Sequence, residues 1–172
     1  NSYVLLIISG ISALIVTYSR DSLLREISKE KHYIFWTSYL LCVAGLLGVT
    51  ITGDAFNTFV FLEISSLSTY VLIAMGSDRR ALIASYRYLI MGTIGATFIV
   101  LGVGLLYALT GTLNLIDIAE RIGVVSDSRT KLAALAFLLV GISLKLALFP
   151  LHAWLPNAYS YSPSVAATFL AA

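Results

Sequence analysis

Long apolar runs alternate with short polar stretches along the whole chain. A helix needs about 20 consecutive apolar residues to cross about 30 Å of hydrocarbon. Five predominantly apolar runs approach this length, and a sixth begins near the C-terminal end: 3–18, 34–52, 55–76, 88–109, 132–149, and from 164 onward. The pattern therefore predicts an all-α membrane protein, a polytopic helical bundle that forms a single transmembrane domain over residues 1–172.

The composition supports a membrane protein and excludes several other classes. Hydrophobic residues make up 59% and charged residues 12% of the chain, against about 45–50% and about 25% in soluble domains. A net charge of +2 argues against a nucleic-acid partner. The single cysteine, Cys42, excludes a disulfide framework and is expected to be a small buried hydrophobe. Because both ends of the chain lie inside apolar runs, we expect an internal fragment of a longer membrane protein.

Basic residues are divided unequally between the two sides of the predicted bundle. Short cytoplasmic loops carry an excess of Lys and Arg. The connections after the first and third runs carry seven basic residues: Arg20, Arg25, Lys29, Lys31, Arg79, Arg80 and Arg87. The connections on the other side carry three: Arg121, Arg129 and Lys131. We therefore expect the first set to be cytoplasmic, so that the runs 55–76 and 132–149 both enter from outside.

Small residues recur at four-residue spacing in two of the predicted helices, at Ala44, Gly48 and Thr52 and at Gly92 and Ala96. Such residues let helix backbones approach closely where lipid offers no hydrophobic driving force. We expect these positions to serve helix packing.

Two residues with opposite charges lie inside the predicted spans, Glu63 and Lys145. A charge at the centre of a bilayer costs about 2.5–3.5 kcal/mol on insertion scales, so such residues normally face a partner or a wet cavity. At about 1.5 Å per residue, Glu63 lies about 12 Å below Ala55 and Lys145 about 20 Å below Leu132. Helical side chains lean toward the N-terminus, which brings the lysine back toward the carboxylate. We expect a contact, direct or through water.

The helix that carries Glu63 also presents a polar column. Ser66 and Tyr70 follow Glu63 at i+3 and i+7, so a carboxylate, a hydroxyl and a phenol share one face. The column either bonds neighbouring helices together or orders waters along which protons move. Asp54, just before the same helix, is expected to be its N-cap.

The prolines of the chain all lie near its C-terminal end, at Pro150, Pro156 and Pro163. Pro150 is expected to end the fifth helix, because it lacks an N–H group and would leave the carbonyl of Leu146 without a helical partner. Irregular backbone at membrane depth is tolerated only against protein or water. A discontinuous helix with an ionisable residue at its break is a recurring ion site in transporters.

Two interpretations of these residues stay open. Burial favours the neutral form of a carboxyl or an amine and an opposite charge favours the ionised form, so a Glu63–Lys145 pair can switch protonation with its surroundings. The pair would then be a proton relay. Alternatively, it is a static salt bridge that orients two helices. His152 is either a further relay residue or, with Trp154, part of an interfacial anchor.

The chain closely resembles the proton-conducting antiporter-like membrane subunits in three segments, GDAFNTFVFLEISSLSTYVLIAMG, RALIASYRYLIMGTIGATFIVLGVGLLYALTGTLNL and LKLALFPLHAWLPNAYSYSPSVAATFLAA. This superfamily includes subunits of respiratory complex I, of membrane-bound hydrogenases and of multi-subunit sodium/proton antiporters. The pattern Lys-x4-Pro-Leu-His-x-Trp-Leu-Pro, from Lys145 to Pro156, is highly specific. Among the branches, the resemblance is nearest to the D-type subunit of the multi-subunit antiporters.

The resemblance implies an inverted-repeat fold in which each repeat has a broken helix and a half-channel. Glu63 matches the carboxylate that pairs with the broken-helix lysine, and Lys145 matches that lysine, the central proton carrier. His152 falls in the stretch just beyond the break. The next relay residue of the family, on the following helix, does not occur before Ala172.

Together these observations predict a proton-translocating membrane subunit of a multi-subunit cation/proton antiporter or an NADH:quinone oxidoreductase-like complex. The expected relay is Glu63, Lys145 and His152, supported by Ser66, Tyr70 and the break at Pro150. Sister membrane subunits and the lipid bilayer are the expected partners, the cargo is the proton with sodium left open, and the location is a bacterial cytoplasmic membrane. The sequence carries no signature of a cofactor or a metal, so any redox step would belong to partner subunits.

Two other functions remain as alternatives. The chain is a non-conducting structural subunit if the Glu63–Lys145 pair only locks helices together. It is an autonomous transporter of an organic substrate if a ligand binds near Pro150 and transport needs no partner subunits.

Overall fold

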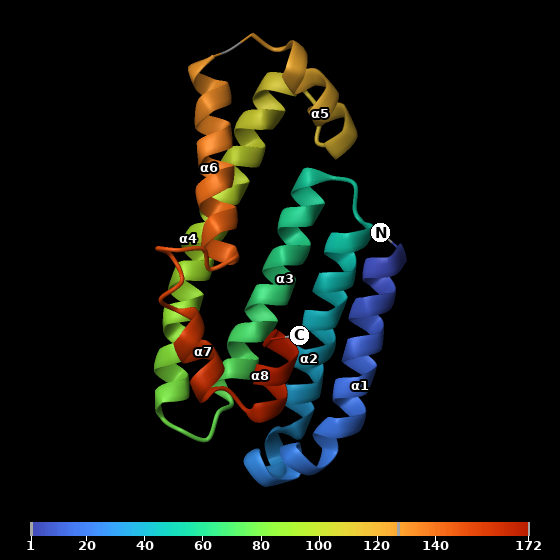
Figure 1. Cartoon of the computed structure of the whole chain (residues 1–172), viewed down its shortest axis with the longest axis vertical. Coiled ribbons are helices and arrows are strands. Elements are labelled where there is room, and N and C mark those ends of the chain that lie inside the picture. The colour runs from blue at the N-terminus through green and yellow to red at the C-terminus, as the bar shows by residue number, and fades with distance from the viewer. Residues whose placement is uncertain (1, 127, 172) are drawn as a thin grey trace.

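The structure is a computed structural model that describes residues 2–126 and 128–171, and its named elements are helices (Figure 1). In chain order they are α1 (Ser2–Glu26), the 3₁₀ turn η1 (Lys29–Lys31), α2 (His32–Ile51), α3 (Ala55–Ala74), α4 (Arg80–Thr110), α5 (Leu115–Val124), α6 (Arg129–Lys145), α7 (Leu155–Tyr161) and α8 (Ser164–Ala171). Within the described residues, extended pairing is limited to an isolated bridge between Asp54 and Asn114. The predicted all-α fold is confirmed.

Four helical segments of the described residues are long and apolar enough to cross a membrane: Ser2–Glu26, Lys29–Ile51, Ala55–Ala74 and Arg80–Thr110. They correspond to the first four predicted spans. The helices at 2–26 and 80–110 run beyond the apolar limits of those spans, because a helix can continue into polar water-facing turns. These apolar helices identify the chain as a multi-pass integral membrane protein.

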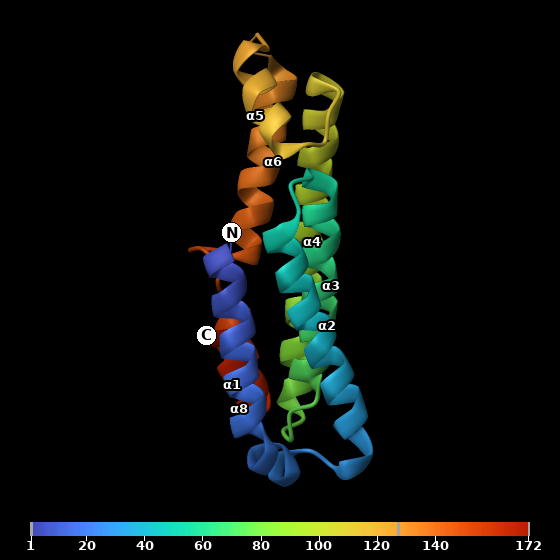
Figure 2. The same cartoon turned by 90° about the vertical axis from the view of Figure 1, so that its right-hand side faces the viewer.

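The helices form an elongated bundle in which α2, α3 and α4 lie side by side (Figures 1 and 2). The upper part of α4 in Figure 1 packs along α6, and its lower part packs against α7. Figure 2 shows α1 and α8 together on the other side of the bundle, and α1 contacts both α2 and α8. Because α4 touches both α3 and α6, it fixes the height of one relative to the other.

Glycines allow the closest approaches between these helices. A Cβ atom at Gly141 in α6 would lie 2.8 Å from the carbonyl oxygen of Gly95 in α4. At Gly48 a Cβ would overlap the ring of Phe61, and at Gly92 it would overlap the hydroxyl of Tyr70. The prediction that Gly48 and Gly92 serve packing is therefore confirmed, whereas Ala44, which was predicted with them, is exposed on α2.

The N-terminal ends of α3 and α5 are joined by two backbone hydrogen bonds of their first residues. The Ala55 N–H donates to the carbonyl of Leu113 at 2.8 Å, and the Leu115 N–H donates to the carbonyl of Gly53 at 2.9 Å. Asp54 caps α3 by accepting from the Asn57 N–H at 2.8 Å, as the sequence predicts. These bonds hold the α2–α3 turn against the connection between α4 and α5.

The end of α6 differs from the prediction, because the helix stops at Lys145 and not at Phe149. Ala147 adopts a left-handed conformation with φ of 50°. The Ala147 N–H then bonds to the carbonyl of Leu144 at 3.3 Å, and the Leu148 N–H bonds to the carbonyl of Ser143 at 3.0 Å. This pattern is a Schellman motif, which satisfies the last helical carbonyls before Pro150 is reached.

As a consequence the fifth predicted span is not one continuous helix. The 17 residues of α6 span about 25 Å at about 1.5 Å per residue. The chain then continues without regular helix from Leu146 to Trp154 and resumes helical structure in α7 at Leu155.

Candidate functional site

Lys145 and Glu63 form an ion pair between α6 and α3. The Lys145 Nζ atom donates to Glu63 Oε1 at 2.8 Å and to Ser66 Oγ at 2.6 Å. The lysine side chain is 11% exposed and the glutamate side chain 22% exposed. The contact expected from the depths of the two residues is therefore present, and it is direct.

The local structure of α6 explains why the lysine reaches this position. Lys145 is the last residue of α6, and in Figure 1 the helix ends beside the middle of α3. A cation at the C-terminus of a helix is stabilised by the partial negative charge of the terminal carbonyls. Ser66 in turn donates to the carbonyl of Leu62 at 2.8 Å, so its oxygen is held facing the lysine as an acceptor. The end of α6 and the hydroxyl oxygen of Ser66 therefore both face the lysine amine.

A cavity of about 290 Å³ adjoins the lysine at the helix break. The walls come from α3, α4, the end of α6, the break, α7 and α8: Ile73, Tyr88, Lys145, Leu146, Ala147, Trp154, Leu155, Ala158, Tyr159 and Leu170. Lys145 is the charged residue in this lining, so the cavity places solvent-sized space beside the lysine.

Stacked aromatic rings form one wall of the cavity. The rings of Tyr88 and Trp154 are parallel with centroids 4.2 Å apart, and Tyr70 meets Tyr88 edge-on at 4.6 Å. Trp154 is buried, and its Nε1 donates to the carbonyl of Leu144 at 3.3 Å. The expectation of an interfacial anchor at Trp154 is wrong, because the side chain packs into the bundle and covers the end of α6.

Tyr70 lies on the polar face of α3 but takes no direct part in the ion pair. Its hydroxyl is buried and makes no hydrogen bond within residues 2–126 and 128–171. The oxygen points at the backbone of Gly92, where a Cβ atom would overlap it. Tyr70 therefore supports the aromatic wall, with an unused donor close to the cavity.

His152 lies in the break and is exposed. Its ring centroid is 5.5 Å from that of Phe149, which is itself 86% exposed. The structure does not bring His152 to the Glu63–Lys145 pair. Pro150 lies between the end of α6 and the start of α7, as predicted, but α6 ends earlier for the reason given above.

Tyr88 and Tyr159 are site residues that the sequence did not single out. Each places an aromatic ring beside the cavity from α4 or α7. An aromatic residue in an apolar helix is too common to mark a site by itself. The available signal was the clustering of Trp154, Tyr159 and Tyr161 just after the break. Among the described residues, no group of three or more His, Cys, Asp or Glu side chains is arranged to hold a metal ion.

The chain is similar to membrane subunits of two kinds of complex. It is 54% identical over 138 residues to NADH-quinone oxidoreductase subunit N of Desulforudis audaxviator, covering 80% of this chain and 27% of that protein. It is 34% identical over 143 residues to the D-type subunit of the Na(+)/H(+) antiporter of Alkalihalophilus pseudofirmus, covering 83% of this chain and 29% of that protein. The oxidoreductase relative thus has the higher identity of the two, although the motifs favoured the D-type antiporter subunit.

Solved structures give the same picture. A chain of an archaeal respiratory complex, the membrane-bound sulfane sulfur reductase, matches with a TM-score of 0.86 and 33% identity. The match covers 94% of this chain and 32% of the matched chain. A chain of respiratory complex I from Thermus thermophilus matches with a TM-score of 0.62 and 29% identity. This match covers 81% of this chain and 33% of the matched chain. The chain spans about a third or less of each of these proteins. The family model described as "NADH:quinone oxidoreductase/Mrp antiporter, TM" matches residues 52–172, and the chain belongs to this family.

Proposed function

We propose that this chain is part of a proton-translocating membrane subunit in which Glu63 and Lys145 relay protons. One observation carries the proposal. Lys145 lies at the end of α6, where its ammonium bonds to acceptors from α3 and the residue lines a cavity of about 290 Å³. An amine in that position can exchange a proton with water while its charge depends on the state of a neighbouring carboxylate.

The relay works through the charge of Glu63. While Glu63 is ionised, its carboxylate stabilises the Lys145 ammonium across 2.8 Å. When a proton reaches Glu63, that stabilisation is lost and Lys145 releases its own proton to water in the cavity. The cavity extends to Tyr159 and Leu170, so the released proton moves toward α8. Transfer of the proton from Glu63 to the neutral Lys145 amine, across the same contact, then restores both the carboxylate and the ammonium and resets the pair.

We further propose that such a subunit works in a multi-subunit complex of a bacterial cytoplasmic membrane, with sister membrane subunits as partners. Relatives that are named as subunits and come from bacteria support this proposal. We assign it to the redox-driven branch, because its identity is 54% to the oxidoreductase relative and 34% to the antiporter relative. His152 remains a proposed relay residue beyond the break. In this assignment the energy comes from partner subunits and the chain itself carries out no covalent chemistry.

Proton movement in inverted membrane vesicles that carry the full parent complex tests the proposal. NADH and a sodium pulse are applied separately, and the lumenal pH is followed for the wild type, Lys145→Ala and Lys29→Ala. Lys29 is an exposed residue in η1 and serves as the control for loss of a lysine. We expect a response to NADH that Lys145→Ala abolishes and Lys29→Ala retains, in complexes that assemble equally.

A response to sodium alone would move the chain to the gradient-driven branch while leaving the relay in place. Transport by the assembled Lys145→Ala complex at the wild-type rate would overturn the relay.

A structural role is the second candidate, and one observation favours it. The Lys145 ammonium has two oxygen acceptors within 2.8 Å, which suits a permanent link between α3 and α6. In that case removal of either partner leaves an unpaired buried charge, at a cost of about 3–5 kcal/mol, and impairs assembly.

A further inference from the structure

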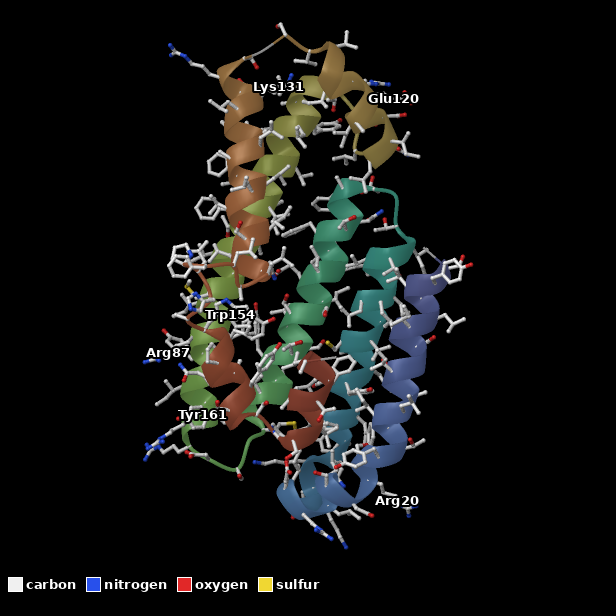
Figure 3. The ribbon with its side chains drawn as sticks, viewed as in Figure 1. Arg20, Arg87, Glu120, Lys131, Trp154 and Tyr161 are labelled. Carbon is white, nitrogen blue, oxygen red and sulfur yellow. The ribbon has the colours of Figure 1, made fainter. Side chains whose placement is uncertain are left out.

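A second cavity, of about 250 Å³, lies between the first turns of α4 and the short helix α7. Its lining consists of Arg80, Ile83, Ala84, Arg87, Asn157 and Tyr161. Figure 3 shows Arg87 and Tyr161 at the same edge of the molecule, far from Glu120 and Lys131 at the other end. This part of the bundle lies on the side that carries seven of the basic residues, which is the expected cytoplasmic side.

The polar groups of this cavity are donors with little acid to neutralise them. Arg80 and Arg87 are seven residues apart and therefore share a face of α4. The guanidinium of Arg80 lies 5.8 Å above the ring of Tyr161, and its Nη1 donates to the Tyr161 hydroxyl at 3.4 Å. In the part of the chain that the structure describes, no hydrogen bond or ion pair involves the side chain of Arg87.

The nearest acidic residue along the chain is Asp78, whose charge acts on Arg80 from outside the cavity. Asp78 accepts from the backbone N–H of Arg80 at 2.8 Å, at the start of α4, and it does not line the cavity. Two guanidinium groups, one phenol and one amide therefore converge on a space without a carboxylate. This donor set suits an anion with several oxygens, and the planar fork of arginine matches a phosphate group.

Apolar side chains continue from the cavity along the outer face of α4. Ile83, in the lining itself, is 54% exposed, and Ile90, two turns further into the predicted membrane region, is 41% exposed. Tyr86 beside them is 62% exposed. A ligand with a phosphate at the basic end and hydrocarbon along this face would match both parts. A free phosphate would use only the first.

We propose that this cavity binds the phosphate of an anionic phospholipid from the cytoplasmic leaflet, with the acyl chains along α4. Basic pockets between helices on the cytoplasmic side are suited to such headgroups. Arg87 supplies the free guanidinium, and Arg80, held by Tyr161, supplies a positioned one. The inference is independent of the proton relay, because neither arginine touches Glu63, Lys145 or their cavity.

Lipid titration of the full detergent-solubilised parent complex, read by native mass spectrometry, tests the assignment. Short-chain phosphatidylglycerol, phosphatidylcholine and inorganic phosphate are added separately to the wild type, to Arg80→Gln/Arg87→Gln and to Arg79→Gln. Arg79 precedes α4 and does not line the cavity, so it is a matched control. Each arginine near an anionic headgroup contributes about a fivefold factor in affinity, so we expect about 30-fold weaker phosphatidylglycerol binding in the double variant.

The arms of the titration separate the possible outcomes. Retained binding in Arg79→Gln, together with weak binding of phosphatidylcholine and of phosphate, supports the lipid site. If the double variant fails to assemble, the two single variants, each expected to bind about fivefold more weakly, provide the same test. Equal phosphatidylglycerol binding by wild type and variants overturns the proposal. Competition by inorganic phosphate at the same concentration overturns the lipid as the ligand and leaves a phosphate site.

Discussion

At the scale of single residues, the state of Lys145 depends on a small number of oxygen atoms. Its ammonium reaches Glu63 Oε1 and Ser66 Oγ, both from α3. An ammonium that is largely removed from bulk water needs such acceptors, because a buried unpaired charge is costly. The serine is therefore more than a packing residue, since it shares the lysine with the carboxylate.

Replacement of Ser66 by alanine should slow transport without loss of the complex. The change removes one acceptor of a charged hydrogen bond, an interaction of about 1.5–3 kcal/mol, so we expect the proton-translocation rate to fall about tenfold. Ser68→Ala is the matched control, because Ser68 also lies on α3 and makes the same type of bond to the carbonyl four residues before it. Equal rates in the two variants would show that the contact with Ser66 has no role in transport.

The sequence predicted this pair but not all of its surroundings. Glu63 and Lys145 lie within regular helices, so their depth follows from counting residues, and the direct contact agrees with the count. Trp154 and His152 follow the helix end, where side-chain direction depends on the path of the backbone. The left-handed conformation of Ala147 sets that path, and an alanine gives no sequence signal for it, because glycine is the usual residue at that position.

At the scale of helices, the relay depends on how closely α4 and α6 pack. α4 contacts both α3 and α6 and thereby sets the height at which Lys145 meets Glu63. The closest approach is at Gly141 and Gly95, where the two backbones leave no space for a side chain. The four-residue spacing predicted Gly48 and Gly92 as packing positions, but Gly141 stands alone in its helix and shows no such pattern.

Gly141→Ala should destabilise the subunit and weaken transport together. A Cβ atom there would lie 2.8 Å from the Gly95 carbonyl and 2.9 Å from the Ile99 nitrogen, both backbone atoms. We expect a loss of about 1–3 kcal/mol in stability, measured by thermal unfolding of the detergent-solubilised subunit. Gly104→Ala in α4, where the added Cβ would meet nothing within 4 Å, should instead gain about 0.5–1 kcal/mol. If Gly141→Ala left the stability unchanged, the close contact between α4 and α6 would not exclude a side chain at position 141, which would contradict this account.

The helix α5 was predicted only as part of a polar connection. Its signals were nevertheless present, since Asn114 caps it by accepting from the N–H groups of Ile116 and Asp117. Ile118 is buried against α4, and Arg121 Nη1 donates to the carbonyl of Thr110 at 2.9 Å. A short amphipathic helix falls below the length of a membrane span, so a search for spans alone does not detect it.

At the scale of the whole molecule, a carboxylate joins the first helix to the last. Glu26 ends α1 and accepts from both the backbone N–H and the hydroxyl of Ser164, the first residue of α8. Ser22 donates to the same carboxylate at 3.1 Å. The proposed path of the proton leads toward α8, so the position of that helix relative to the rest of the bundle matters for transport.

Glu26→Ala should loosen α8 while leaving the Glu63–Lys145 pair intact. Loss of a carboxylate cap at a helix N-terminus costs about 0.5–2 kcal/mol, so we expect a corresponding decrease in stability and faster amide hydrogen exchange in α8. Glu30→Ala, an exposed acidic residue in η1, is the control and should leave both measurements unchanged. Unchanged exchange in α8 of the Glu26→Ala protein would contradict a role for this contact in holding the helix.

The measurement that decides between relay and static salt bridge is proton translocation by the full complex with Glu63→Gln. Glutamine keeps the size of the side chain and an oxygen acceptor for Lys145 but cannot change its charge. If the pair relays protons, the variant assembles as the wild type does and its NADH-driven proton translocation falls below about a tenth of the wild-type rate, a barrier increase of at least about 1.4 kcal/mol. Translocation at the wild-type rate, or loss of assembly with normal transport by the complexes that do form, would contradict the relay and leave the pair as a structural link.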